Sequence, residues 1–444
     1  MIPPSPFRLP VPMRASSLLV ALSAVLLGAS GALAQGQNNY GSIYSRYGLG
    51  ERQDFGSSQA EMLGGSQASL RSGIYNGLVN PALWSDQQIT TFSASVGIAG
   101  VRSTDATAAD ASRATAGDVA GIQLGVPLLP GRLGLTLAYR PYSRVNYRTS
   151  VPGELVTEDD TTAFALNQEG SGGLQRISGG LGLKLAQGVQ VGAAADVVFG
   201  TVEYLQRTAF SEPGFNETRQ ARATQLRGVT ATLGAAATLR SLRADDDALT
   251  LGLALTLPTR LSGTRTLTLG ESLDRDTLAV VADGRTTLPL LARAGLSYRS
   301  GARWLTTVDA LYEPWSSFDS DFSVGGFDAD AGLDDLQDRV RVGGGVELLP
   351  AGRGRNAGFF GRTSYRLGAY GERGLYAPSD RSVSTLALTG GVSVPNRFSG
   401  ARFDLGFEVG SRGSVSNGLV RDVFARGSLT LNFGERWFIR RRID

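Results

Sequence analysis

No cysteine and no histidine occur among the 444 residues, and Lys184 is the only lysine. Without cysteine the chain cannot form a disulfide framework. Without histidine it lacks the Ser-His and Asp-His pairs that serve general base catalysis. The Gly-Lys pair of a phosphate-binding P-loop is missing as well. We therefore expect no enzyme activity, no cofactor and no metal site.

Long hydrophobic runs are also absent, except at the N-terminus. Arg8 and Arg14 precede an apolar stretch at 16–31, and Ala32-Leu33-Ala34 matches a signal-peptide cleavage site. These features predict a signal peptide over residues 1–34, with an uncleaved membrane anchor as the alternative. Its removal lowers the formal net charge from +3 to +1. A nearly neutral mature chain gives no reason to expect nucleic-acid binding.

The sequence has a strong alternation of apolar and polar residues instead. Between Arg402 and Val409 every second residue is apolar, which indicates a strand with one apolar and one polar face. Similar runs recur from Thr91 onwards, and many have about ten residues, enough to cross a bilayer as a tilted strand. Because backbone groups in lipid must be hydrogen-bonded internally, we predict an all-β fold, a closed antiparallel transmembrane β-barrel. The expected strands are fourteen: 89–101, 120–127, 132–148, 174–185, 189–208, 221–240, 248–263, 281–299, 303–318, 338–349, 357–373, 383–395, 400–413 and 421–434.

The lengths of the links between these strands alternate. Links after even-numbered strands are short, such as 186–188 and 396–399, whereas those after odd-numbered strands are mostly long, such as 149–173 and 319–337. Bacterial barrels have short periplasmic turns and longer outer loops. We therefore expect both termini in the periplasm.

Charged residues in the strands are expected to face the lumen, because a charge facing lipid at mid-depth costs about 2–4 kcal/mol. In the strand at 338–349, for example, Arg339 and Arg341 lie on the face opposite Val340 and Val342. Two interpretations stay open: a salt-bridge mesh that stiffens the barrel, or a charged path for the headgroup of a substrate. The predicted lumenal set is Arg339, Arg341, Arg362, Arg366, Arg402, Asp404, Glu408 and Arg426.

Residues 35–88 lack the alternation and are rich in glycine, serine and tyrosine. Such a segment cannot form a core of its own, but its aromatic and aliphatic residues favour burial. We predict a hatch inside the lumen, with a disordered periplasmic tail as the alternative. The expected domains are a signal peptide at 1–34, the hatch at 35–88, the barrel at 89–435 and a basic periplasmic C-terminal tail at 436–444.

Two stretches resemble the FadL family, outer-membrane transporters of long-chain fatty acids and other hydrophobic compounds. The stretch 62–68, Met-Leu-Gly-Gly-Ser-Gln-Ala, followed by Asn80-Pro81-Ala82, is similar to the family's N-terminal hatch. Leu288-Pro289, the strand 291–299 and then Trp315-Ser316 are similar to a later family pattern. The resemblance implies a fourteen-stranded barrel with a hatch and no catalytic residues. It also implies that the ligand pathway passes the hatch residues Gly64, Gly65, Asn80, Pro81 and Ala82.

Two further features concern access to the barrel. Pro141 lies inside the third expected strand, where it cannot donate to the ladder. In FadL-like barrels a kink in this region opens sideways to the membrane, and a simple bulge is the alternative here. Phe318, Phe322 and Phe327 form either a capture site for a hydrophobic ligand or a small core that folds the loop over the barrel mouth. The aspartates of that loop lack calcium-loop spacing, which favours a solvated loop.

These observations predict a passive outer-membrane channel for hydrophobic compounds such as long-chain fatty acids. The alternative is a non-transporting barrel that anchors or assists secreted or surface proteins. We expect the protein in the outer membrane of a Gram-negative-type bacterium. Its expected partners are outer-membrane lipid, hydrophobic small molecules and, during insertion, the barrel assembly machinery.

Overall fold

The computed structural model describes residues 41–105, 111–156, 161–212, 216–270, 278–323, 336–352, 358–396 and 401–437. All of them belong to one compact unit, Tyr40–Asp444. The predicted signal peptide, Phe327 and residues 438–444 lie outside the described residues. Among the described residues, no helix has the length and apolar character needed to cross a membrane.

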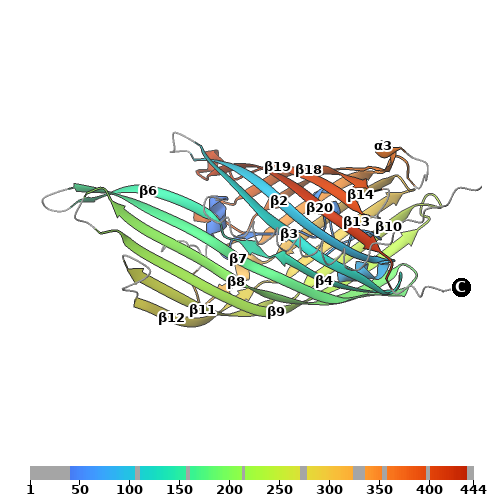
Figure 1. Ribbon diagram of the computed structural model, residues 1–444, viewed down its shortest axis with the longest axis horizontal. Helices are drawn as coiled ribbons and strands as arrows, with labels where there is room; N and C mark the ends of the chain where they lie inside the picture. The colour runs from blue at the N-terminus through green and yellow to red at the C-terminus, as the bar shows by residue number, and fades with distance from the viewer. Residues whose placement is uncertain are drawn as a thin grey trace, which may run out of the picture. The chain divides into compact units, whose positions relative to one another are not determined.

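Fourteen antiparallel wall strands close into a barrel, which confirms the predicted fold class (Figure 1). Four of the fourteen are interrupted and carry two or three labels each: β4 to β6, β10 with β11, β12 with β13, and β14 with β15. Closure joins β2 to β20 over fifteen residue pairs, from Thr90↔Glu435 to Thr104↔Arg421. The wall elements are β2 (Thr90–Thr104), β3 (Ser112–Leu129), β4 (Leu133–Pro141), β5 (Ser143–Arg144), β6 (Tyr147–Val156), β7 (Thr161–Ala186), β8 (Val189–Phe210), β9 (Thr218–Arg240), β10 (Ala248–Thr256), β11 (Thr259–Gly270), β12 (Leu278–Leu288), β13 (Leu291–Ser300), β14 (Trp304–Glu313), β15 (Asp319–Ser320), β16 (Arg339–Leu348), β17 (Ser364–Arg373), β18 (Ser384–Pro395), β19 (Arg402–Arg412) and β20 (Arg421–Glu435).

Strand β19 shows why the alternation produces a membrane wall. Its apolar residues Phe403, Leu405 and Phe407 are 44%, 53% and 51% exposed on the outside of the barrel, whereas Asp404 between them is fully buried. Side chains of a strand alternate between its two faces. The strand therefore offers lipid an apolar surface and keeps its carboxylate in the lumen.

The predicted strand ends need correction at one end of the barrel. The ranges 102–119, 149–173 and 264–280, expected as loops, are mostly strand, and β7 alone has 26 residues. These extensions project beyond the membrane-sized part of the wall, at the left of Figure 1. Outside the membrane no face of a strand has to be apolar, so the extensions lack the signal on which the prediction depended. We call this end the extended end and, from its long connections, place it at the cell exterior.

The third wall strand is broken at Pro141. There β4 ends, Ser143–Arg144 (β5) turns inward and pairs with β1 (Glu51–Arg52), and the chain returns to the wall as β6. Both β4 and β6 pair with β7, but β3 pairs with β4 only from Ile122 onwards. Within the described residues, the stretch 112–121 of β3 pairs with β2 and has no strand partner on its other side. The wall is therefore open between this stretch and β6.

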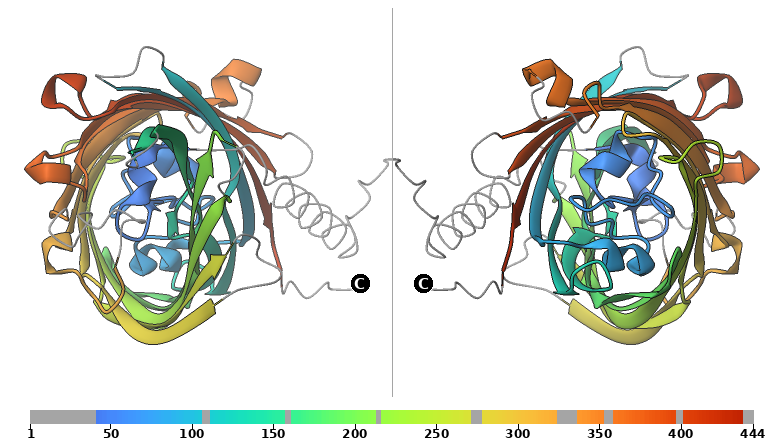
Figure 2. Two further views of the ribbon diagram at one scale, coloured as in Figure 1. Left: turned by 90° about the vertical axis from the view of Figure 1, so that its left-hand side faces the viewer. Right: turned by 90° about the vertical axis from the view of Figure 1, so that its right-hand side faces the viewer.

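The barrel interior is filled by residues 41–89, which we call the lumenal segment (Figure 2). It contains η1 (Ile43–Arg46), β1, α2 (Ser58–Glu61) and η2 (Pro81–Asp86). Near the extended end, its Tyr44, Tyr47 and Leu49 join a buried cluster with wall residues such as Leu226 and Trp315. Deeper in the barrel, Leu63 and Leu70 pack with Ala60 and Leu305.

Candidate functional site

Asn80, Pro81 and Ala82 fasten the lumenal segment to one side of the wall. Asn80 is fully buried; its Nδ2 atom donates to the Ala68 carbonyl oxygen at 2.6 Å, and its side chain accepts from the Ala82 N–H. The backbone here touches wall glycines so closely that a Cβ atom on Gly192 would lie 2.3 Å from the Pro81 carbonyl carbon. In this structure the three residues are a docking point of the lumenal segment. They do not line the cavity that lies between this segment and the wall from β16 to β3.

Gly64 and Gly65 form a second docking point on the opposite side. Gly64 has φ +70°, and a Cβ atom there would lie 2.3 Å from the Ala369 carbonyl oxygen. Its N–H donates to the Thr389 hydroxyl at 2.9 Å. Gly65, with φ +79°, lies against the Arg341 guanidinium and borders the cavity. Only glycine fits both the conformation and the space at Gly64.

Ion pairs also connect the lumenal segment to the wall on the side of the docking points that faces the extended end. Asp54 pairs with Arg293 at 3.0 Å and with Arg339. Arg52 pairs with Glu313 at 2.9 Å. Burial alone would raise the pKa of Asp54, but the guanidinium groups of Arg339 and Arg293 hold this pKa well below its usual range. These groups therefore stay charged at neutral pH and neutralise one another.

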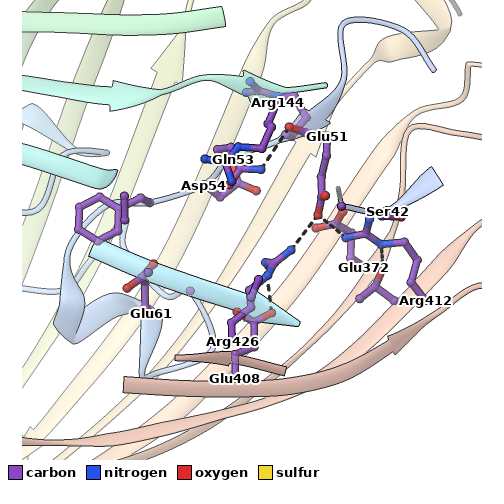
Figure 3. A pocket seen from close by; sticks show the side chains of 18 of the residues that line it. Ser42, Glu51, Gln53, Asp54, Glu61, Arg144, Glu372, Glu408, Arg412 and Arg426 are labelled. Atoms are coloured by element: carbon purple, nitrogen blue, oxygen red, sulfur yellow. Dashed lines mark hydrogen bonds and ion pairs between the residues drawn. The ribbon is translucent and has the colours of Figure 1, made fainter. Parts of the chain in front are cut away.

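Glu51 extends this network toward β19 and β20. Its Oε1 atom accepts from Arg412 at 2.6 Å and from Arg426 at 2.8 Å. Burial opposes ionisation here too, but the two guanidinium groups lower the pKa of Glu51 to about 2. Arg426 also forms an ion pair with Glu408 at 3.6 Å. Figure 3 marks the contacts of Arg426 with both carboxylates. One carboxylate of the lumenal segment thus joins two wall strands.

A second network closes the other end of the lumen. Tyr75 donates to Asp404 at 3.1 Å, and Asp404 also accepts from Asn432 and Ser58. Arg366 pairs with Glu347 at 2.5 Å and lies over the Tyr75 ring at 5.1 Å. The buried charges of this network are all engaged by partners, which is the condition for keeping them inside a protein.

A cavity of about 190 Å³ lies between the lumenal segment and the wall from β16 through β20 to β2 and β3. Charged groups from both sides border it, among them Asp54, Glu372 and Arg426 (Figure 3). Glu61, on α2, also borders it, and its Oε2 atom is buried without a hydrogen-bond partner among the described residues. Burial, with the nearby carboxylates of Glu408 and Asp118, raises the pKa of Glu61 to about 8. Glu61 is therefore mostly protonated at neutral pH.

The cavity reaches the opening in the wall. Its border includes Ala116, Asp118 and Ala120, from the stretch of β3 that pairs with β2 alone. Pro141 and Arg144 border it on the other side of the opening. Arg144 pairs with Asp118 at 2.5 Å. This ion pair connects the two sides of the opening, and both side chains keep about a quarter of their surface exposed.

The structure places most of the predicted lumenal charges inside the barrel, but the prediction that Arg362 lies on a wall strand is wrong. Arg339, Arg341, Arg366, Arg402, Asp404, Glu408 and Arg426 all contact other lumenal groups. Arg362 instead ends α3 (Phe359–Arg362), a helical turn in the link between β16 and β17. Phe359 and Phe360 there are both exposed, 54% and 75%. Two adjacent outward phenylalanines cannot belong to one strand, whose side chains alternate.

The predicted capture residues are partly described. Phe318 and Phe322 are 6% and 5% exposed and belong to the buried cluster near the extended end. In this structure both are core residues. Phe327 lies outside the described residues, as does most of the aspartate-rich loop. Among the residues that are described, no cluster of potential metal ligands occurs.

Several residues of the site were not identified from the sequence. Glu51, Arg52 and Asp54 are close together in a segment otherwise rich in glycine and tyrosine, which was the one signal that pointed to them. Glu61, Asp118 and Arg144 carried no such signal. Their importance depends on the inward turn of β5, which residue patterns alone do not define.

Fold and site together define a class: an outer-membrane β-barrel whose lumen is closed by its own N-terminal segment. The predicted outer-membrane location is confirmed, and the resemblance to the FadL family is confirmed at the level of the fold. The BamG family model matches residues 18–444, and the chain belongs to the BamG family. No curated protein sequence matches the chain.

Solved structures share the fold at low identity. The toluene transporter TbuX of Ralstonia pickettii is 15% identical, with a TM-score of 0.54 over 86% of this chain and 99% of that one. The toluene transporter TodX of Pseudomonas putida is 15% identical, with a TM-score of 0.53 over 88% and 100%. A FadL homologue of Pseudomonas aeruginosa is 14% identical, with a TM-score of 0.51 over 86% and 98%.

Proposed function

We propose that the protein is a passive outer-membrane channel that admits small hydrophobic compounds through the opening beside Pro141. The observation that carries the proposal is the break in the wall, because it joins the lipid-facing surface to the cavity. A ligand dissolved in the outer leaflet would reach the cavity without crossing the polar surface outside. TbuX and TodX, which share the fold, are described as toluene transporters. That description supports the proposal for this chain.

The size of the cavity favours small ligands in the closed state. An engineered apolar cavity of about 150 Å³ binds benzene, so about 190 Å³ is enough for one aromatic ring. A long acyl chain would need more room, which only displacement of the lumenal segment would provide. The charged groups that border the cavity pair with one another, so binding of an apolar ligand does not require the desolvation of unpaired ions. Long-chain fatty acids are the second class of cargo in this proposal.

Release into the periplasm requires the lumenal segment to move. Its docking points are at Gly64 and Asn80. In this proposal transport is diffusion, and the lumenal segment acts as the hatch. The residues Gly64, Gly65, Asn80, Pro81 and Ala82 hold the hatch in its closed position in this proposal.

Locking the opening tests the proposal. The chain has no cysteine, so Asp118→Cys with Arg144→Cys can be joined by a short bifunctional methanethiosulfonate reagent. Cells carrying this variant in the outer membrane should lose uptake of labelled toluene when locked and regain it after reduction. The two single-cysteine variants, treated with the same reagent, are the controls. Unchanged uptake after complete cross-linking would disprove the lateral route.

A second function has its own support. The many ion pairs that fix the lumenal segment favour a permanent plug, and the family name BamG suggests a connection to the barrel assembly machinery. In that case the barrel would anchor or assist other surface proteins. No uptake of toluene or oleate by either the locked or the reduced form, with normal protein in the membrane, would favour this function.

A further inference from the structure

Three arginines gather on the outside of the wall near the extended end. Arg102 of β2 is paired in register with Arg113 of β3. Arg421 of β20 is paired with Thr104, two residues from Arg102 on the same face. All three side chains are exposed. Neighbouring strands are about 4.8 Å apart, so the three guanidinium groups can reach one point on the surface.

Along the barrel axis, the three arginines lie at the level of the outer edge of the membrane. Below Arg102 the outward residues of β2 are Gly100, Ile98, Val96, Ala94 and Phe92, with Ile98 60% exposed. Phe92 pairs with Phe433 at the opposite edge of this apolar stretch. Ten residues span about 33 Å along a strand, or about 25 Å of membrane at the usual tilt, which is the height of the apolar band of such barrels. Arg102 therefore lies at the level of the outer headgroups.

No ion pair within the described ranges neutralises these three charges. Like charges placed directly opposite on neighbouring strands destabilise a sheet, and Arg102 and Arg113 are such a pair. Two carboxylates of these strands point inward: Asp422 accepts from Ser103 at 2.6 Å, and Asp118 pairs with Arg144. In the part of the chain that is described, Arg102, Arg113 and Arg421 form no ion pair and no side-chain hydrogen bond.

We propose that Arg102, Arg113 and Arg421 bind the phosphorylated headgroup of an outer-leaflet lipid. The apolar stretch below holds the acyl chains, and the three guanidinium groups hold the phosphate, the anion that arginine binds best. Arg113 belongs to the stretch of β3 that borders the opening in the wall. The bound lipid therefore lies beside the opening. Because the site is on the outer surface, it does not depend on transport through the barrel.

Native mass spectrometry of the purified barrel tests this site with diphosphorylated lipid A as the probe. The variant Arg102→Gln/Arg113→Gln/Arg421→Gln should bind it on the order of 100-fold more weakly, because each arginine near an anionic surface contributes about a factor of five. Dephosphorylated lipid A should bind wild type and variant equally. The matched control is Arg132→Gln/Arg240→Gln/Arg303→Gln, which removes three exposed arginines from the other end of the barrel. It should bind like the wild type.

Three results would overturn the proposal. Equal binding by wild type and variant would show that the cluster is not the site. An equal loss in the control would show a general effect of net charge. Displacement of the lipid by inorganic phosphate at the same concentration would show a free-anion site. Heat-modifiable migration of each variant establishes that its barrel is folded.

Discussion

Replacing Asp54 by asparagine should loosen the lumenal segment and leave the barrel closed. Asp54 belongs to the lumenal segment, and its partners Arg293 and Arg339 belong to the wall. Arg341 lies within 3.6 Å as well. Asparagine keeps the shape and one acceptor oxygen but removes the charge. The substitution therefore removes the carboxylate that Arg293 and Arg339 share where segment and wall meet. Arg293 keeps only the more distant Asp309, at 3.8 Å, among its described carboxylate partners.

The magnitude follows from the burial of these groups. The side chains of Arg293 and Arg339 are 3% and 2% exposed. Removing one partner of a buried ion pair costs about 3–5 kcal/mol. Applied to the equilibrium between docked and displaced segment, this raises the displaced population by about 100-fold to several thousandfold. The fourteen wall strands keep their hydrogen bonds, so the closed barrel should survive.

Planar-bilayer conductance and limited proteolysis measure the displaced state. The wild type should conduct rarely, and Asp54→Asn should show frequent openings. Trypsin should cleave the variant after Arg52 or Arg71, which the wild type protects inside the lumen. Both measurements use the full chain in a folded barrel, identified by heat-modifiable migration.

Asp196→Asn is the matched control. Asp196 is as buried as Asp54 and pairs with Arg176 at 2.5 Å, but both residues belong to the wall. Its loss should lower the thermal stability without raising conductance or cleavage of the lumenal segment. If Asp54→Asn leaves conductance unchanged, or if both variants change it equally, the ion pairs do not hold the segment in place.

Three further predictions concern the lumenal segment and the wall. Because the pKa of Glu61 is raised to about 8, the stabilisation from its protonated form is complete below the ordinary value near 4.5, decreases as the pH rises and is lost above about 8. Protease protection of the segment should therefore fall between about pH 5 and about pH 8 in the wild type and stay constant in Glu61→Gln. Gly64→Val should displace the segment, since its Cβ would lie 2.3 Å from a wall carbonyl oxygen, whereas Gly73→Val has nothing within 4 Å and should behave as wild type in the conductance assay. Leu405→Arg places a charge in lipid and should lower barrel stability in urea by about 2–4 kcal/mol, while Arg402→Leu, on the lumenal face, should insert normally; equal tolerance at the two positions would contradict the facing.

The membrane part of the wall was predictable because lipid imposes a rule on every residue there. In β19 each outward position is apolar or small and each inward position is charged or glycine, so the strand and its facing follow from the sequence. The requirement for apolar outward residues applies only to the part of a strand that lies in the membrane. Residues 149–156 and 161–173 continue as strand in water, where neither face must be apolar, and the sequence there therefore resembled a loop.

The lumenal site was predictable only in outline. Glycines and tyrosines indicated a segment that fills the barrel, but its partners are far away in the chain. Asp54 bonds to Arg293, 239 residues later, and Glu51 bonds to Arg412, 361 residues later. Which lumenal charges meet depends on the barrel's register and on the inward turn of β5. Neither property is encoded in a local pattern, so the ion-pair network could not be derived from the sequence.

Closing a lumen with ion pairs has a physical consequence that closing it with apolar packing would not have. Ion pairs lose much of their attraction to desolvation, so a buried pair is near balance with two hydrated ions. The contacts of Glu51, Arg52 and Asp54 thus fix where the segment docks. With both partners present each pair adds little net stability, whereas removal of one partner, as in Asp54→Asn, is costly. When water enters the cavity, these groups regain hydration, and the displaced state is less costly than one that exposes apolar surface. The tyrosine cluster near the extended end has no such compensation, so the segment should detach first at its charged contacts around the cavity.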